Sequence, residues 1–76
     1  MIFDRIEWDE HSLDHATRRL TAAEIEQAIW NADRMKVSRR DPTRARIESV
    51  TDGGQTVVLI VEVLHDGPRP ITGWEA

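Results

Sequence analysis

The sequence predicts an α+β protein in which two helices pack on one face of an antiparallel sheet. Apolar residues recur at helical spacing through the first half of the chain. After residue 34 the spacing changes to the alternation that is typical of strands. Two helices that follow one another in the chain are expected to cover the same face of a sheet. With a first strand ahead of the helices and three or four antiparallel strands after them, the predicted order is β-α-α-β-β-β, with one further strand as the alternative.

The length and composition predict one small soluble domain, residues 1–76. The chain has no cysteine, so packing, helped by a partner or a second copy in a homodimer, must supply its stability. The longest apolar run, residues 57–61, is too short to span a bilayer, and no signal peptide is visible. We therefore expect a cytoplasmic protein with no membrane partner.

The first third of the chain predicts a strand and two helices. Residues 2–8 favour a strand with Ile2, Ile6 and Trp8 on one face. The segment 8–19 favours a short amphipathic helix whose apolar face holds Leu13, Ala16 and Leu20, with His11, His15 and Arg18 opposite. Residues 21–32 predict the clearest helix, which starts at a capping box of Thr21 and Glu24. Its buried side is expected to consist of Ile25, Ala28, Ile29 and Ala32.

The rest of the chain predicts strands over residues 34–38, 44–50, 55–64 and 71–74. The segment 44–50 alternates charged and apolar residues, and the turn 51–54 contains the Asp-Gly pair that tight hairpins favour. Residues 55–64 are apolar on both faces, which predicts a central strand. Gly73, in the last strand, suggests a bulge or a close approach of another segment.

A basic segment, residues 34–46, stands out in a chain whose net charge is −4. Its basic residues are Arg34, Lys36, Arg39, Arg40, Arg44 and Arg46, and its one acid is Asp41. Such a cluster is either a solvated hairpin or a phosphate-binding surface, because clustered cations raise the local affinity for anions. The phosphate-binding interpretation assigns the first five of these cations to nucleic-acid binding.

Histidines provide the candidate chemistry. His11 and His15 have the i,i+4 spacing of helical metal ligands, and Asp14 or His65 could in principle add a third. The glutamate of an H-E-x-x-H motif is missing, so we expect no metal and no cofactor. Phosphate-binding and nucleophile-elbow motifs are also missing. Histidine and arginine do suit metal-free RNA cleavage, which needs a base, an acid and cations around the phosphate.

The order of these segments resembles the BrnT family of small toxins. The similar positions are Trp8 and Asp9, His15 or the pair Arg18 and Arg19, residues 21–25, Arg46, and residues 69–72. The resemblance implies a RelE-like fold and a ribonuclease that halts translation. It also implies a cognate DNA-binding antitoxin as partner.

These observations lead to two hypotheses about function. In the first, the protein is a BrnT-like endoribonuclease in which His15 is the acid or base, and Arg46 and Arg69 stabilise the phosphate. In the second, it is a non-catalytic protein–protein interaction module of the same fold. Its anchors would be Trp8, Trp30 and Trp74, because large aromatic side chains at surfaces often mark interfaces.

Overall fold

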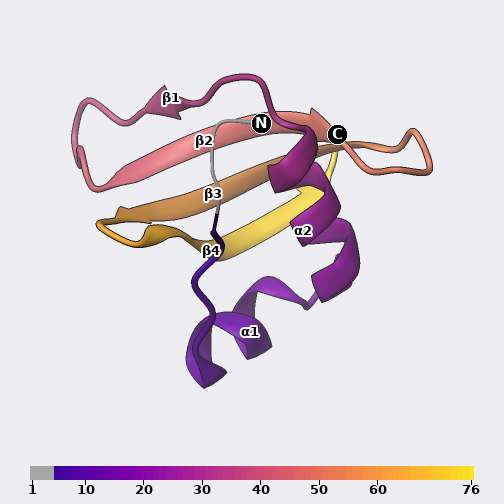
Figure 1. Cartoon of the computed structure of the whole chain (residues 1–76), viewed down its shortest axis with the longest axis horizontal. Coiled ribbons are helices and arrows are strands. Elements are labelled where there is room, and N and C mark those ends of the chain that lie inside the picture. Colours follow the sequence, from indigo (N-terminus) through magenta and orange to yellow (C-terminus); the bar gives the residue numbers. More distant parts are fainter. Residues whose placement is uncertain (1–4) are drawn as a thin grey trace.

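The computed structural model describes residues 5–76 as two helices followed by a four-stranded antiparallel sheet (Figure 1). The elements are α1 (Glu10–Ala16), α2 (Ala22–Asn31), β1 (Lys36–Val37), β2 (Arg44–Val50), β3 (Thr56–Leu64) and β4 (Gly67–Glu75). The strands lie in the order β1-β2-β3-β4, so each pairs with its neighbour in the sequence. The α+β class, the antiparallel sheet and the central position of β3 are thus confirmed.

The prediction of a first strand over residues 2–8 is wrong for residues 5–8, the part of it that the structure describes. Residues 5–8 form no strand, and Ile2 lies outside the described residues. The segment passes the start of β4, where the amide of Glu7 donates to the carbonyl of Pro68 at 2.8 Å. The approach is close, because a Cβ on Gly67 would lie 2.7 Å from the carbonyl oxygen of Arg5. The described order is therefore α-α-β-β-β-β.

Helix α1 is shorter than predicted and buries a different side. It ends at Ala16, where the hydroxyl of Thr17 donates to the carbonyl of Leu13 at 2.6 Å. The buried helical residues are Ser12 and Ala16, whereas Leu13 is 42% exposed. Leu20 reaches the core from the turn that follows the helix. The assignment of Leu13 to the core is wrong, because the capped start of α1 turns Ser12 inward.

Helix α2 forms as the sequence predicts. The hydroxyl of Thr21 accepts the amide of Glu24 at 3.1 Å, and the Glu24 carboxylate accepts the amide of Thr21 at 2.9 Å. These two bonds satisfy two amides that a helix start would otherwise leave without partners. The predicted apolar side is buried throughout, and its members are Ile25, Ala28, Ile29 and Ala32.

Replacing Thr21 with alanine is expected to lower the free energy of unfolding by about 1 kcal/mol, because the cap loses its acceptor. Urea unfolding followed by circular dichroism measures the change. Thr21→Ser is the matched control, since serine keeps the hydroxyl and should leave stability nearly unchanged. Equal losses in both variants would contradict a capping role for this hydroxyl.

The core lies between the helices and one face of the sheet. Strand β2 places Ala45 and Ile47 in this core and exposes Arg44, Arg46 and Glu48 on the opposite face, called the outer face below. Strand β3 adds Val57, Leu59 and Val61, and both helices contribute residues to the same core. Figure 1 shows α1 beside β4, at the border of the sheet. No helix within residues 5–76 is long and apolar enough to cross a membrane.

Strand β4 starts earlier than predicted, at Gly67 instead of residue 71. Both of its prolines, Pro68 and Pro70, are buried. A proline fits an edge strand because the amide hydrogen that it lacks would point away from the neighbouring strand, where no ladder hydrogen bond is lost. A Cβ on Gly73 would lie 2.6 Å from Leu59 Cδ2, which confirms the predicted close approach. The irregularity in pairing lies instead opposite Ile60 and Val61, where β4 holds one extra residue.

Candidate functional site

An open cavity of about 430 Å³ lies where α1 meets the outer face of the sheet. We call it the histidine hollow. Its lining residues come from α1 and its cap and from three strands, and are Asp9, His11, Ser12, His15, Arg44, Glu62, Arg69 and Ile71. Three residues that the sequence singled out for chemistry or binding, His15, Arg44 and Arg69, are therefore brought to one place.

The register of the sheet builds the floor of the histidine hollow. Arg44 pairs with Glu62 across β2 and β3, and Glu62 pairs with Arg69 across β3 and β4. Directly paired residues have side chains on the same face, so the three form one row across the outer face. Their neighbours Ala45 and Val61 point into the core, which fixes the row on the outer side.

Helix α1 carries the two histidines to this row. Their rings are stacked, with centroids 6.1 Å apart and planes inclined by 15°, and both side chains are exposed. The i,i+4 spacing explains the stacking, because such residues are neighbours on one side of a helix. Two imidazoles thus line the same cavity as two guanidinium groups.

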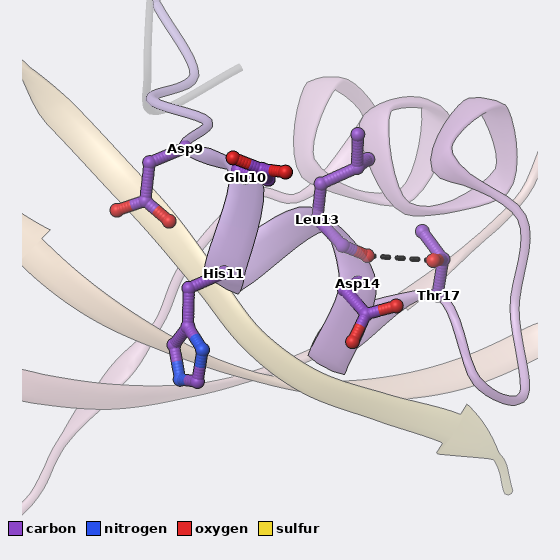
Figure 2. Close-up of a pocket in the computed structure, with 6 residues that line it drawn as sticks. All are labelled: Asp9, Glu10, His11, Leu13, Asp14 and Thr17. Atoms are coloured by element: carbon purple, nitrogen blue, oxygen red, sulfur yellow. Dashed lines mark hydrogen bonds between the residues drawn. The ribbon is translucent and has the colours of Figure 1, made fainter.

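A broader hollow of about 840 Å³ runs along α1 and shares Asp9 and His11 with the histidine hollow (Figure 2). Figure 2 shows these two side chains on one side of the helix and Asp14 and Thr17 on the other. Its lining comes only from residues 9–17. A surface made by one short segment offers no groups that converge from different elements, so the histidine hollow is the better candidate site.

Arg69 is held by two carboxylates. Its Nη1 donates to Asp9 Oδ2 at 3.0 Å, and its Nη2 donates to Glu62 Oε1. The hydrogen bond with Glu62 and the charges of both acids raise the pKa of Arg69 above its usual value. The amide of Ser12, followed by the charge of Arg69, lowers the pKa of Asp9. Asp9 and Arg69 therefore both stay charged at neutral pH.

The ion pair of Asp9 is expected to make stability pH-dependent. A carboxyl whose pKa is lowered by folding stabilises the folded state above its unfolded-state pKa, and this contribution disappears as the pH falls through the folded-state pKa. The difference in unfolding free energy between wild type and Asp9→Asn should be largest at neutral pH and disappear once the pH falls below the lowered folded-state pKa of Asp9. Urea unfolding across this range measures it, and a pH-independent difference would contradict the assignment.

Arg46 does not reach the histidine hollow. It lies two residues from Arg44 on the same face of β2, a step of about 7 Å along the strand. Its Nε pairs with Glu48 Oε1 at 3.2 Å. The outer face has a second hollow besides the histidine hollow, with a volume of about 610 Å³, lined by Arg34, Met35, Lys36, Arg46 and Glu48. Arg39 and Arg40 are exposed in the connection before β2 and line neither hollow.

The three tryptophans do not form one surface. Trp8 packs against the core, and its Nε1 donates to Glu26 of α2 at 3.0 Å. Trp30 is half-buried on α2. Trp74 pairs with Val58 and so lies on the outer face, opposite the core that Trp8 contacts. Any single interface could use Trp74 or Trp8, but not both.

Sequence reasoning did not assign Asp9 and Glu62 to the site. A signal for Glu62 was present, because it is the one charged residue in the apolar run 57–64. Asp9 carried a weaker signal as a capping residue before an expected helix. His65, the remaining histidine, is exposed in the turn between β3 and β4 and does not line the hollow.

Within residues 5–76 no three His, Asp or Glu side chains are arranged to hold a metal ion. The histidine hollow is lined by imidazole, guanidinium and carboxylate groups. Comparison with protein-family models, with curated proteins and with solved structures finds no match to this chain.

Proposed function

We propose that the protein is a divergent BrnT-like toxin that acts as a metal-independent endoribonuclease. The observation that carries the proposal is the stacked pair His11 and His15 in one hollow with Arg44 and Arg69. Histidine is the side chain best suited to give and take protons near neutral pH. Guanidinium groups recognise phosphate oxygens through paired hydrogen bonds.

The pair can divide the work of phosphodiester cleavage. One imidazole removes the proton of a ribose 2′-hydroxyl, and the 2′-oxygen forms a bond to phosphorus while the bond from phosphorus to the 5′-oxygen breaks. The other imidazole, protonated beforehand, gives its proton to the departing 5′-oxygen. The products are a 2′,3′-cyclic phosphate and a 5′-hydroxyl. A positive guanidinium beside the phosphate stabilises the charge that develops on its oxygens.

The basic segment supports a nucleic-acid substrate over a small phosphoester. Lys36 pairs with Arg46 across β1 and β2, and Arg44 follows on the same face toward the histidine hollow. These cations lie on one continuous face that leads to the histidines. A polymer with one phosphate per residue can contact all of them, whereas a single phosphate cannot. The 2′-hydroxyl required by the reaction favours RNA over DNA.

The proposal also covers the partner, which the resemblance implies, and the location, which the composition predicts. In this proposal a cognate antitoxin neutralises the protein in the cytoplasm, and a homodimer is a further arrangement to test. The outer face is the surface on which an antitoxin would block RNA access to the histidine hollow.

Expression in bacteria tests the proposal. Induction of the wild-type chain should arrest growth and produce new RNA ends, and His15→Ala should relieve the arrest at equal protein level. Arrest that persists in His15→Ala would remove this histidine from the mechanism. Normal growth and intact RNA with folded wild-type protein would contradict the nuclease proposal.

A second candidate is the interaction module, favoured by the outer face itself. Val50 is 43% exposed there, and Ile60 and Trp74 are only half-buried. The salt dependence of binding distinguishes the nuclease from the interaction module. RNA binding should weaken steeply between low and moderate salt because counterions are released on binding. Association through Trp74 should respond little to salt and be lost in Trp74→Ala.

A further inference from the structure

Arg69 connects three parts of the molecule. It lies on β4, its Nη2 donates to Glu62 on β3, and its Nη1 donates to Asp9 just before α1. Its side chain is 32% exposed, which leaves it less accessible than the 48% exposed side chain of Arg44. The guanidinium therefore acts as a bridge between the sheet and the start of the helix that carries the histidines.

Asp9 uses its two carboxylate oxygens for two different tasks. Oδ1 accepts the amide of Ser12 at 2.7 Å and caps α1, while Oδ2 accepts Arg69 at 3.0 Å. The Ser12 hydroxyl in turn accepts the amide of Asp9 at 3.1 Å. The residue that starts the helix is thus also the residue that ties it to the sheet.

Helix α1 needs such a tie. It has 7 residues, and an isolated helix of that length is not stable in water. Its buried contribution is limited to Ser12 and Ala16, which are small side chains. The contact between Asp9 and Arg69 therefore adds a polar tie with defined geometry to the apolar contacts that Ala16, Trp8 and Leu20 make with the core.

The charges around Arg69 and Arg44 indicate different roles for the two arginines. Asp9 and Glu62 outnumber the single charge of Arg69, so this group of three carries a net negative charge. Arg44 has its ion pair with Asp41, at 3.6 Å, and Asp41 is not part of the lining. A phosphate that enters the hollow thus meets Arg44 as its less restrained cation.

We propose that Arg69 is a positioning residue that fixes α1 through Asp9, and that Arg44 is the arginine that binds the scissile phosphate. This inference rests on the proposed nuclease function and changes the role that the sequence suggested for Arg69. Asp9 then also belongs to the positioning machinery, although it contacts no substrate.

Steady-state cleavage of a short RNA tests this assignment with Asp9→Asn, Arg69→Gln and the double variant. Asparagine keeps the helix cap, so Asp9→Asn removes mainly the ion pair. We expect each single variant to lower kcat about 10- to 100-fold with KM nearly unchanged, because the histidines lose their alignment. The double variant should be little worse than either single one. Asp14→Asn, the same change on the far side of α1, should retain full activity.

Measurements of RNA affinity distinguish a positioning role of Arg69 from direct contact of Arg69 with the phosphate. In the His15→Ala background, Arg44→Gln should weaken RNA affinity and reduce the salt slope by about one unit, while Arg69→Gln should leave both unchanged. Weaker binding in Arg69→Gln, together with unchanged cleavage in Asp9→Asn, would overturn the assignment and make Arg69 a phosphate ligand.

A third readout separates this inference from the nuclease proposal. Imidazole signals in NMR spectra report the surroundings of His11 and His15 without any cleavage. Asp9→Asn and Arg69→Gln should shift these signals in the same way and leave those of His65 in place. If the wild type cuts no RNA but these shifts occur, the nuclease proposal is wrong and the positioning of α1 by Arg69 is supported. If the signals of His11 and His15 do not move, the positioning role is wrong.

Discussion

Replacing His15 with alanine is expected to lower the rate of RNA cleavage by roughly 10²- to 10⁴-fold, the usual contribution of a general acid or base. The stacked partner His11 stays in place, but one imidazole cannot both remove the 2′-proton and protonate the leaving oxygen within one turnover. Single-turnover cleavage of an end-labelled RNA measures this loss at the chemical step. RNA affinity should change little, because Arg44 and the basic segment are untouched.

The matched control for this change is His65→Ala, which removes the same side chain from the exposed turn between β3 and β4. It should cleave RNA at the wild-type rate. Circular dichroism of both variants establishes that each is folded. Equal losses in His15→Ala and His65→Ala would show that the activity does not come from the histidine hollow.

The largest effect on stability is expected for Leu59→Ala in the central strand. Leu59 is fully buried between β2 and β4 and faces the helices. Losing its side chain should lower the unfolding free energy by about 2–5 kcal/mol. Domains of this size are stable by roughly 4–11 kcal/mol, so the variant should unfold at a much lower urea concentration. Val50→Ala, at an exposed position of the same sheet, is the control and should change little.

Gly73 provides an internal check on this packing. A Cβ on Gly73 would lie 2.6 Å from Leu59 Cδ2 and 3.1 Å from Leu20 Cδ1. Gly73→Ala alone should therefore destabilise the protein by about 1–3 kcal/mol. In the Leu59→Ala background the nearest clash is gone, so Gly73→Ala should lower the unfolding free energy by clearly less. Strict additivity of the two losses would contradict this contact.

The elements that the sequence predicted well are those set by local rules. Helix α2 forms at its capping box, and its apolar side is buried as the spacing indicates. Strand β2 has the predicted bounds, 44–50, because charged and apolar residues alternate without interruption. Both features depend on residues within a few positions of each other, which is the range in which sequence patterns are informative.

The elements that differed depend on contacts between distant segments. Residues 5–8 have a strand-like pattern, yet they meet the start of β4 at a backbone approach that leaves room only for Gly67. Residues 67–70 fell outside the predicted strands, but an edge position lets their two prolines join β4. Leu13 shows the same limit, since α1 packs against β4, far away in the sequence, with Ser12 and Ala16 buried and Leu13 exposed.

The candidate site shows the same difference between local sequence patterns and contacts between distant segments. Residue chemistry predicted that His15, Arg44 and Arg69 serve a phosphate, and the structure brings them to one hollow. It could not predict the row Arg44, Glu62 and Arg69, because that row follows from the register of three strands. The same register separates Arg46 from the histidines and places it in the second hollow.

The most direct test of the central claim is cleavage of an end-labelled RNA by the purified protein in the presence of EDTA. The account predicts cleavage that leaves a 2′,3′-cyclic phosphate and a 5′-hydroxyl. It also predicts no cleavage at a position where the RNA carries a single 2′-deoxynucleotide. Intact RNA with folded protein, or cleavage at the 2′-deoxy position, would contradict catalysis by the His11 and His15 pair.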